Sequence, residues 1–558
     1  MDRNAFLAFA LSFLVLSLWM TYEAQHRAEQ QPPAVAQESA TPAAPAVDPV
    51  SPSATATAKP EAPKPEAAVP AAPTAAEQDI DVESELFHAV LSSRGAGIER
   101  YELRQYSAAA NEGGGPVVLI DRGAGEAPAF ATPLPELGFG DLGNALFRVV
   151  SSSAREVVFE YTQSSVTVRK TFSFEDASYR FRLRLEIENG AAAAISPAFG
   201  VVLPERAQPG SDFRELTLAT LSAGSVERAP LAGFGQPGFF SRDPALEQEF
   251  VGDVEWAGAY SHYFLTAVMP DAPRDVRVRW FAAQPGEEAH ITLAHPPAAI
   301  LPGTALSRDY GVYAGPKEPE RLELAGAQLE RSIDLGWSWV APLTRAFVWL
   351  LKACYAVIPN YGVAIILLTV LVRLATAPLA ARQMRSMKRM GELQPKLKEL
   401  QEKYKDDRQQ QSQAMMALYK EAGVNPLGGC LPILLQFPVF IGLYYALQSS
   451  IDLRQAEFGL WIDDLSRPET LFTIPGVGWP VRVLPILMTL SMVLQQKMTP
   501  TTSMDPVQAR TMMIVMPIMF FFMFYGFPSG LVLYWFVSNL LAILQQVYLN
   551  RQMGPKTA

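Results

Sequence analysis

The sequence predicts an α+β multidomain protein: a polytopic α-helical membrane core, six spans in all, a large antiparallel β-sandwich domain and a cytoplasmic helical hairpin. Three observations support this prediction. An apolar segment begins the chain, period-two alternation runs through its middle, and five strongly apolar stretches follow. With 49% hydrophobic and 18% charged residues, the composition suits a chain that is part soluble and part lipid-embedded.

The N-terminal segment, residues 1–29, is predicted to be a transmembrane anchor. Its apolar run from Asn4 to Tyr22 would extend roughly 27 Å as a helix, enough to cross the hydrocarbon core. A cleaved signal peptide is the alternative, but no small-x-small cleavage site follows the run. More than half of residues 30–78 are alanine or proline, which predicts an extended tether.

Residues 79–334 are predicted to form the β-sandwich. Between Tyr179 and Glu188, apolar and charged residues alternate, so one face of this strand packs on a core while the other meets water. The same alternation recurs at Val157, Phe159, Tyr161, Val166, Val168, Phe172 and Phe174. Short strands at such intervals are typical of an antiparallel sandwich.

The composition changes after residue 334. Residues 335–358 combine three tryptophans with Arg345 and Lys352, which is typical of an amphipathic helix at a membrane surface. The five-span core is predicted at residues 359–550, followed by a short tail at 551–558. Its apolar stretches cover approximately 360–380, 427–448, 481–497, 511–527 and 529–547.

The basic residues predict the orientation of these spans. Residues 382–428, which include the hairpin predicted at 382–426, contain ten lysines and arginines, whereas residues 449–480 contain only Arg454 and Arg467. Because basic loops remain in the cytoplasm, the hairpin is predicted inside and the 449–480 loop outside. Alternation then places both termini in the cytoplasm and the β-sandwich outside.

Several long motifs in the C-terminal half resemble those of the YidC family. They are Met415-Met-Ala-Leu-Tyr-Lys420, Asn425-Pro-Leu-Gly-Gly-Cys430, Gln436-Phe-Pro438, Gln496-Lys-Met-Thr-Pro-Thr-Thr502, Asp505-Pro506, Phe527-Pro-Ser-Gly-Leu-Val-Leu-Tyr534 and Val537-Ser-Asn539. The detailed resemblance covers residues 335–546, and the layout is similar to the Gram-negative type with a large periplasmic domain.

This resemblance implies a membrane protein insertase and chaperone of the bacterial inner membrane. Such a protein inserts and helps fold other membrane proteins, alone or with the Sec translocon, through a hydrophilic groove open to the cytoplasm and to lipid. The implied partners are nascent membrane proteins, membrane lipids, the Sec translocon and the ribosome. The tail after Arg551 has few basic residues, which leaves open whether it contacts ribosomes.

Arg373 is the focal candidate residue, because apolar residues flank it on both sides. A charge inside a span costs about 2.5–3.5 kcal/mol on insertion scales, and such a cost usually marks function. Two interpretations remain open: Arg373 lines a water-filled cavity, or it extends toward the cytoplasmic headgroups near Arg382. Thr369 lies one turn earlier on the same helical face.

Two sets of residues are predicted to act on the client, which is the nascent membrane protein being inserted. The substrate groove is assigned to Arg373, Thr369, Gln436, Trp535, Tyr534, Met523, Ser538 and Asn539. For Ser538 the competing interpretation is a simple interhelical hydrogen bond. The cytoplasmic recruitment surface is assigned to Arg385, Lys388, Arg389, Lys396 and Lys398, with a solvated basic loop as its alternative.

Other function classes are predicted to be absent. The sequence shows no phosphate-binding glycine loop, catalytic set or metal-ligand spacing, so we expect no enzyme activity, cofactor or small-molecule substrate. The net charge of −10 argues against DNA as a partner. An anion transporter or channel would usually show internal repeats, and none is visible. A periplasmic carbohydrate-binding protein is the second alternative, although His88, His262, His290 and His295 form no acid–base spacing.

Overall fold

The computed structural model describes residues 77–552, with gaps at 109–113, 124, 208–215, 238–244, 275, 406, 423–430, 477 and 499–505. The predicted anchor at 1–29 and nearly all of the predicted tether at 30–78 lie outside the described residues. Most of the 551–558 tail lies outside them as well.

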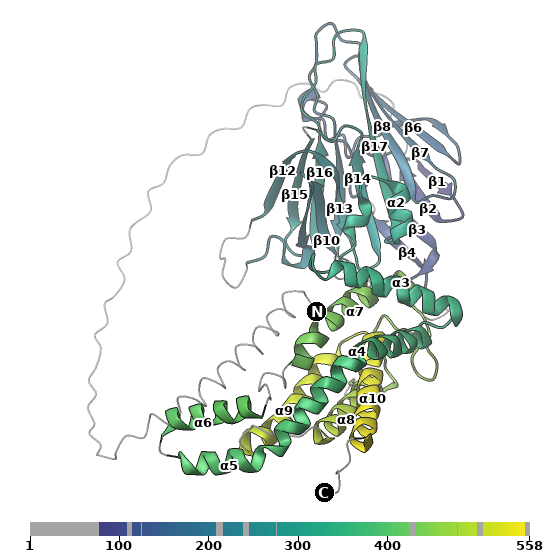
Figure 1. Ribbon diagram of the computed structural model, residues 1–558. Helices are drawn as coiled ribbons and strands as arrows, with labels where there is room; N and C mark the ends of the chain where they lie inside the picture. The colour runs from purple at the N-terminus through teal and green to yellow at the C-terminus, as the bar shows by residue number, and fades with distance from the viewer. Residues whose placement is uncertain are drawn as a thin grey trace, which may run out of the picture. The chain divides into compact units, whose positions relative to one another are not determined.

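The N-terminal half of the described chain is built from three antiparallel sheets (Figure 1). The strands are β1 (Asp79–Glu83), β2 (Phe87–Ser92), β3 (Gly97–Ser107), β4 (Pro116–Asp121), β5 (Arg148–Ser152), β6 (Glu156–Gln163), β7 (Val166–Phe174), β8 (Arg180–Asn189), β9 (Gly200–Arg206), β10 (Thr217–Ser222), β11 (Ser225–Pro230), β12 (Glu247–Gly252), β13 (Val254–Tyr260), β14 (Phe264–Pro270), β15 (Val276–Gln284), β16 (Glu288–Ala294) and β17 (Thr304–Pro316). The largest sheet has the order β11-β10-β13-β14-β17-β8-β7-β6-β5, and the smaller sheets are β1-β2-β3-β4 and β12-β15-β16-β9. Four short helices complete this part: η1 (Pro135–Leu137), η3 (Leu231–Gly233), α2 (Pro319–Ala325) and η4 (Leu329–Ser332).

Side chains from these sheets share one hydrophobic core, as a sandwich requires. Trp280 on β15 is fully buried, and its Nε1 donates a hydrogen bond of 3.0 Å to Thr220 Oγ1 on β10 in the largest sheet. On the other small sheet, Tyr101 stacks against Phe181 of β8 with ring centroids 6.2 Å apart. The period-two prediction is confirmed, because the apolar residues predicted to face inward are buried, except for the partly buried Tyr161.

The C-terminal half is helical. Its elements are α3 (Ala341–Val357), α4 (Tyr361–Glu392), α5 (Gln394–Lys403), α6 (Arg408–Glu421), α7 (Leu431–Ser449), η6 (Ile451–Leu453), β18 (Phe472–Thr473), β19 (Pro480–Val481), α8 (Val483–Met498), α9 (Pro506–Tyr525) and α10 (Ser529–Gln552). A helix therefore occupies each of the five predicted apolar stretches. Among the described residues, two helical segments, Tyr361–Arg382 and Ser529–Arg551, are long and apolar enough to cross a membrane, while Val483–Met498 and Met513–Tyr525 are shorter apolar segments.

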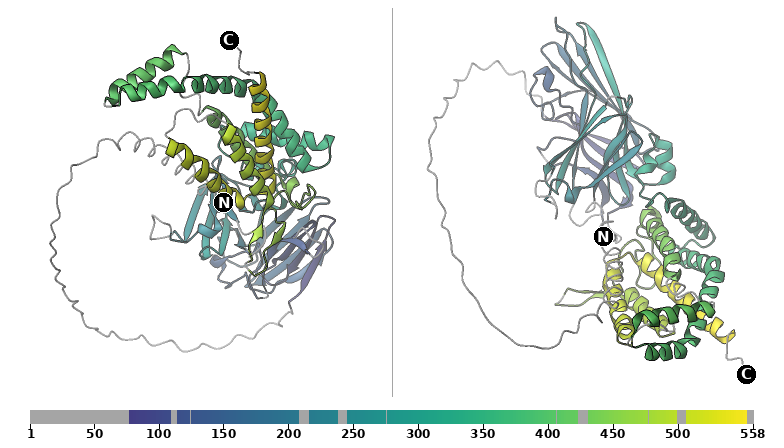
Figure 2. Two further views of the ribbon diagram at one scale, coloured as in Figure 1. Left: turned by 90° about the horizontal axis from the view of Figure 1, so that it is seen from below. Right: turned by 60° about the vertical axis from the view of Figure 1, so that its left-hand side comes forward.

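The predicted start of the helical hairpin at residue 382 differs from the structure. α4 continues to Glu392, and the two helices packed against each other are α5 and α6, seen as neighbouring green helices in Figure 2. The sequence from Ala380 to Met390 contains no glycine or proline, so nothing interrupts α4 there. Pro395 in the first turn of α5 suits the start of a new helix, because its missing N–H has no intrahelical partner at that position.

Candidate functional site

Arg373 is held between two helices of the C-terminal half. α4 packs against α10, and this contact brings Arg373 next to Ser538, which is buried. The guanidinium donates two hydrogen bonds to Ser538 Oγ, from Nε at 2.9 Å and from Nη2 at 2.6 Å. The side chain therefore turns toward α10 instead of extending along α4 to Arg382.

A second polar contact continues from this pair. Tyr534 lies one turn before Ser538 on α10, and its hydroxyl accepts a hydrogen bond of 2.8 Å from Nε2 of Gln436 on α7. Gln436, Tyr534, Ser538 and Arg373 thus form a polar seam from α7 across α10 to α4. Polar groups among apolar helices are usually hydrogen-bonded, and each of these four residues has at least one hydrogen-bond partner here.

No carboxylate neutralises Arg373. Within the described part of the chain its hydrogen bonds go to one neutral hydroxyl, and it forms no ion pair. A guanidinium has five N–H donors, and Ser538 engages only two of them. The half-buried side chain therefore keeps its full positive charge and has donors left for another anionic or carbonyl group.

The other predicted groove residues lie around this seam. Thr369 is buried and donates its hydroxyl hydrogen bond to Ile365 O at 2.6 Å, within its own helix. Trp535 packs into an aromatic cluster, edge-on to Phe440 at 4.9 Å and tilted against Phe524 at 5.0 Å. Met523 is half-buried on α9. Only four of the eight predicted residues therefore make up the polar seam.

Asn539 belongs to a separate contact. It is buried, and its Nδ2 donates to Ser491 Oγ on α8 at 3.1 Å. Ser491 was not among the predicted residues, although a serine inside an apolar stretch is a signal for an interhelical hydrogen bond. This pair fixes α10 against α8 on a side that the Arg373 seam does not use.

The predicted recruitment residues lie on two helices. Arg385 and Arg389 are exposed on the last turns of α4, and Lys396 is exposed on α5. Lys388 is on α4 and Lys398 on α5, but their side chains lie outside the described part of the structure. Leu397, next to Lys396 on α5, is buried, so Lys396 lies on a different, outer side of this helix.

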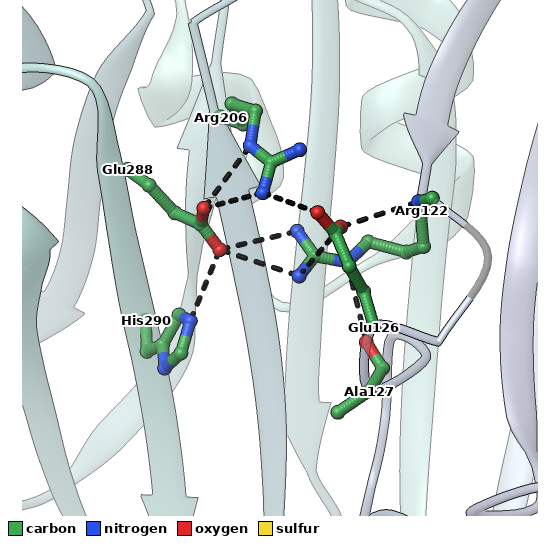
Figure 3. A network of polar contacts seen from close by, with 7 residues as sticks. Arg122, Glu126, Ala127, Arg206, Glu288 and His290 are labelled. Carbon is green, nitrogen blue, oxygen red and sulfur yellow. Dashed lines mark hydrogen bonds and ion pairs between the residues drawn. The ribbon is translucent and has the colours of Figure 1, made fainter.

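The β-sandwich carries a charged network of its own (Figure 3). Glu288 accepts hydrogen bonds from Arg206 at 2.7 and 3.0 Å and from Arg122 at 3.3 Å, and it contacts His290 Nε2 at 3.2 Å. Glu126 accepts a further bond from Arg206 at 2.8 Å. Each acid thus pairs with a base of the same network, which favours a structural role for this cluster.

Other titratable groups of the described β-domain have local partners or shifted pKa values. His88 pairs with Asp81 on a neighbouring strand at 2.9 Å, and burial lowers the pKa of His295. Burial also raises the pKa of Glu205, on β9 beside this network, to about 8. In the described residues, Glu205 Oε1 has no hydrogen-bond partner.

Comparison with known proteins assigns both halves of the chain. Residues 79–350 match the family described as YidC periplasmic domain, and residues 353–556 match 60Kd inner membrane protein. "Membrane protein insertase YidC" of Geobacter sp. (strain M21) is 37% identical over 492 residues, covering 86% of each chain. The protein of the same name from Pelobacter propionicus is 34% identical over 572 residues, covering 99% of each. A solved structure described as an active YidC insertase is 18% identical, with a TM-score of 0.36, and covers 85% of this chain and 93% of its own.

Proposed function

This chain belongs to the YidC family of membrane protein insertases, and we propose that its polar seam forms the client-facing wall of a hydrophilic groove. The family places the chain in the inner membrane, with a periplasmic β-domain, nascent membrane proteins as substrates and lipids around it. The relatives share a name that describes an insertase. We therefore set aside the three alternatives, which are an enzyme, an anion transporter and a carbohydrate-binding protein.

The uncompensated charge of Arg373 carries this proposal. A client must move a polar and often acidic segment across the hydrocarbon core, where a lone carboxylate loses its hydration. A guanidinium part-way across offers a carboxylate charge-assisted hydrogen bonds that replace part of that hydration. The client's apolar segment meanwhile leaves sideways into lipid, because burial of its own apolar surface drives that step.

The proposed topology has six spans, with both termini in the cytoplasm. It assigns spans to the anchor at 1–29, α4, α7, α8, α9 and α10. α3 fits a membrane surface, because Phe347 and Leu351 are buried while Trp349 is exposed, as is Trp339 just before the helix. The basic residues from Arg382 to Lys420 support a cytoplasmic position for α5 and α6.

We further propose that the basic ends of α4 and α5 recruit partners. Exposed Arg385, Arg389 and Lys396 present positive charge where a ribosome or an anionic lipid surface would approach. Cooperation with the Sec translocon is proposed from the family alone. Charge reversal at these three residues should lower ribosome cosedimentation if recruitment depends on them, while leaving posttranslational insertion of short clients intact.

The test of the groove uses clients that differ only in charge. Arg373→Ala and Arg373→Lys are reconstituted in proteoliposomes with a single-span client whose translocated tail carries either acidic or neutral residues. We expect Arg373→Ala to slow insertion of the acidic tail at least tenfold and of the neutral tail much less, with partial rescue by lysine. Equal rates for both tails in Arg373→Ala would contradict the role of the charge.

A further inference from the structure

An uncharged hairpin precedes α8 in the chain. Residues 471–481 contain no charged residue, and β18 pairs with β19 through Phe472 opposite Val481. Most of its described apolar side chains are exposed to solvent: Leu471 is 47% exposed, Phe472 53%, Ile474 40% and Trp479 51%. A contiguous exposed apolar surface of this kind marks a site that another apolar phase covers.

The hairpin is fixed to the ends of two helices. The ring of Trp479 meets Tyr525, the last residue of α9, edge-on at 6.1 Å, and the Tyr525 hydroxyl donates to Pro480 O. Arg482 donates to Tyr525 O, which ties the base of the hairpin to the same helix end. Glu469 then accepts a hydrogen bond of 2.7 Å from Leu484 N in the first turn of α8. These contacts fix the position of the hairpin relative to the N-terminal end of α8 and the C-terminal end of α9.

Those two helices are apolar and meet the hairpin at one end. α8 begins at Val483, directly after β19 and Arg482, and the apolar segment Met513–Tyr525 of α9 ends at the tyrosine that binds Pro480. In the proposed topology, the N-terminal end of α8 and the C-terminal end of α9 face the periplasm, which is where the hairpin lies.

We propose that the hairpin of residues 471–481 inserts into the outer leaflet of the bilayer. Phe472, Ile474 and Trp479 lie at the boundary between headgroups and acyl chains, where aromatic side chains are enriched. The hairpin thereby continues the apolar surface of α8 and α9 toward the headgroups. Lipid is the occupant because the hairpin joins directly to a lipid-facing helix and offers no charge for a polar partner. This inference rests on the proposed topology.

Fluorescence at a single cysteine tests the position of the hairpin. Ile474→Cys is made in full-length protein carrying Cys354→Ser and Cys430→Ser, labelled with an environment-sensitive nitrobenzoxadiazole and reconstituted in phosphatidylethanolamine–phosphatidylglycerol vesicles. The matched control is Val251→Cys on β12, an apolar residue that is 64% exposed in the β-domain. We expect lipids brominated near the glycerol end of the acyl chain to quench the label at position 474 at least threefold more than at 251, and iodide to show the reverse.

Three outcomes are distinguishable. Quenching by lipid with protection from iodide supports the inference. Full access to iodide places the hairpin in water, and protection from both quenchers shows that protein covers it; either result overturns the inference. Phe472→Cys provides a second label position if Ile474→Cys does not fold. Client insertion is measured in the same vesicles. If insertion is lost while the hairpin still contacts lipid, the result counts against the proposed function and not against this inference.

Discussion

Arg373 on α4 and Ser538 on α10 meet through two hydrogen bonds that share a single acceptor oxygen. The two residues are 165 positions apart in sequence, and their contact joins the two helices and sets the direction of the guanidinium. The hydroxyl thus orients a charge that it does not neutralise.

Ser538→Ala is expected to weaken both the fold and the insertion of acidic clients. A hydrogen bond to a charged group contributes about 1.5–3 kcal/mol, and its loss also frees the guanidinium to change rotamer. Thermal unfolding in detergent should show a lower midpoint than wild type. Thr376→Ala is the control, because its hydroxyl bonds only to carbonyls of its own helix, Val372 O at 2.9 Å and Arg373 O at 3.3 Å. An equal loss in both variants would argue against a special role for Ser538.

Gln436 and Tyr534 are expected to act as a coupled pair. Tyr534→Phe removes the acceptor of Gln436 Nε2 and should cost about 0.5–1.5 kcal/mol of stability. Gln436→Leu should cost a similar amount, and the double variant less than the sum, because the same hydrogen bond is lost only once. A double-mutant cycle from unfolding in detergent measures this coupling. Strict additivity would show that the two residues contribute independently.

The β-domain is expected to lose stability as the pH rises through the neutral range. The pKa of Glu205 is raised by burial from 4.5 to about 8 in the folded state, so folding favours the protonated acid. Its stabilising contribution is full below about pH 4.5 and is lost as the pH approaches about 8. Glu205→Gln should abolish this decrease of stability with rising pH, measured by amide hydrogen exchange of β9 and β16. Glu249→Gln, at an exposed carboxylate on β12, should leave it unchanged.

Glu469→Ala is expected to loosen the first turn of α8. Its carboxylate accepts the Leu484 N–H, and removal of such a cap costs about 0.5–2 kcal/mol. Hydrogen exchange at residues 483–487 should accelerate, while α10 remains protected. Glu457→Ala, in the same connecting loop, serves as the control, because its side chain does not cap α8. Unchanged exchange at α8 would show that the cap is dispensable.

The sequence supported the layered β-domain because period-two alternation reports directly on which face is buried, as Phe181 and Leu183 show. Arg373 was identifiable because a charge is costly among apolar residues. Its partner was not, because the sequence does not specify which face of α10 meets α4. The role of Ser538 therefore stayed open between groove and interhelical contact until helix packing placed it beside Arg373.

Other elements were harder to predict. The start of the hairpin at residue 382 was predicted from charge, which marks a membrane surface but does not end a helix, and α4 runs on to Glu392. The roles of Glu469 and Tyr525 at the ends of α8 and α9 depend on tertiary contacts that have no local signature. Periodicity was informative about burial, whereas pairings across long sequence separations required the structure.

A guanidinium supported only by a neutral oxygen discriminates by the sign of the charge that passes it. In the proposed groove, aspartate and glutamate side chains of a client are drawn toward Arg373, whereas lysine and arginine meet repulsion. Arg373 would thus favour retention of basic client segments on the cytoplasmic side. The chain's own basic loop is placed on that side by the same preference.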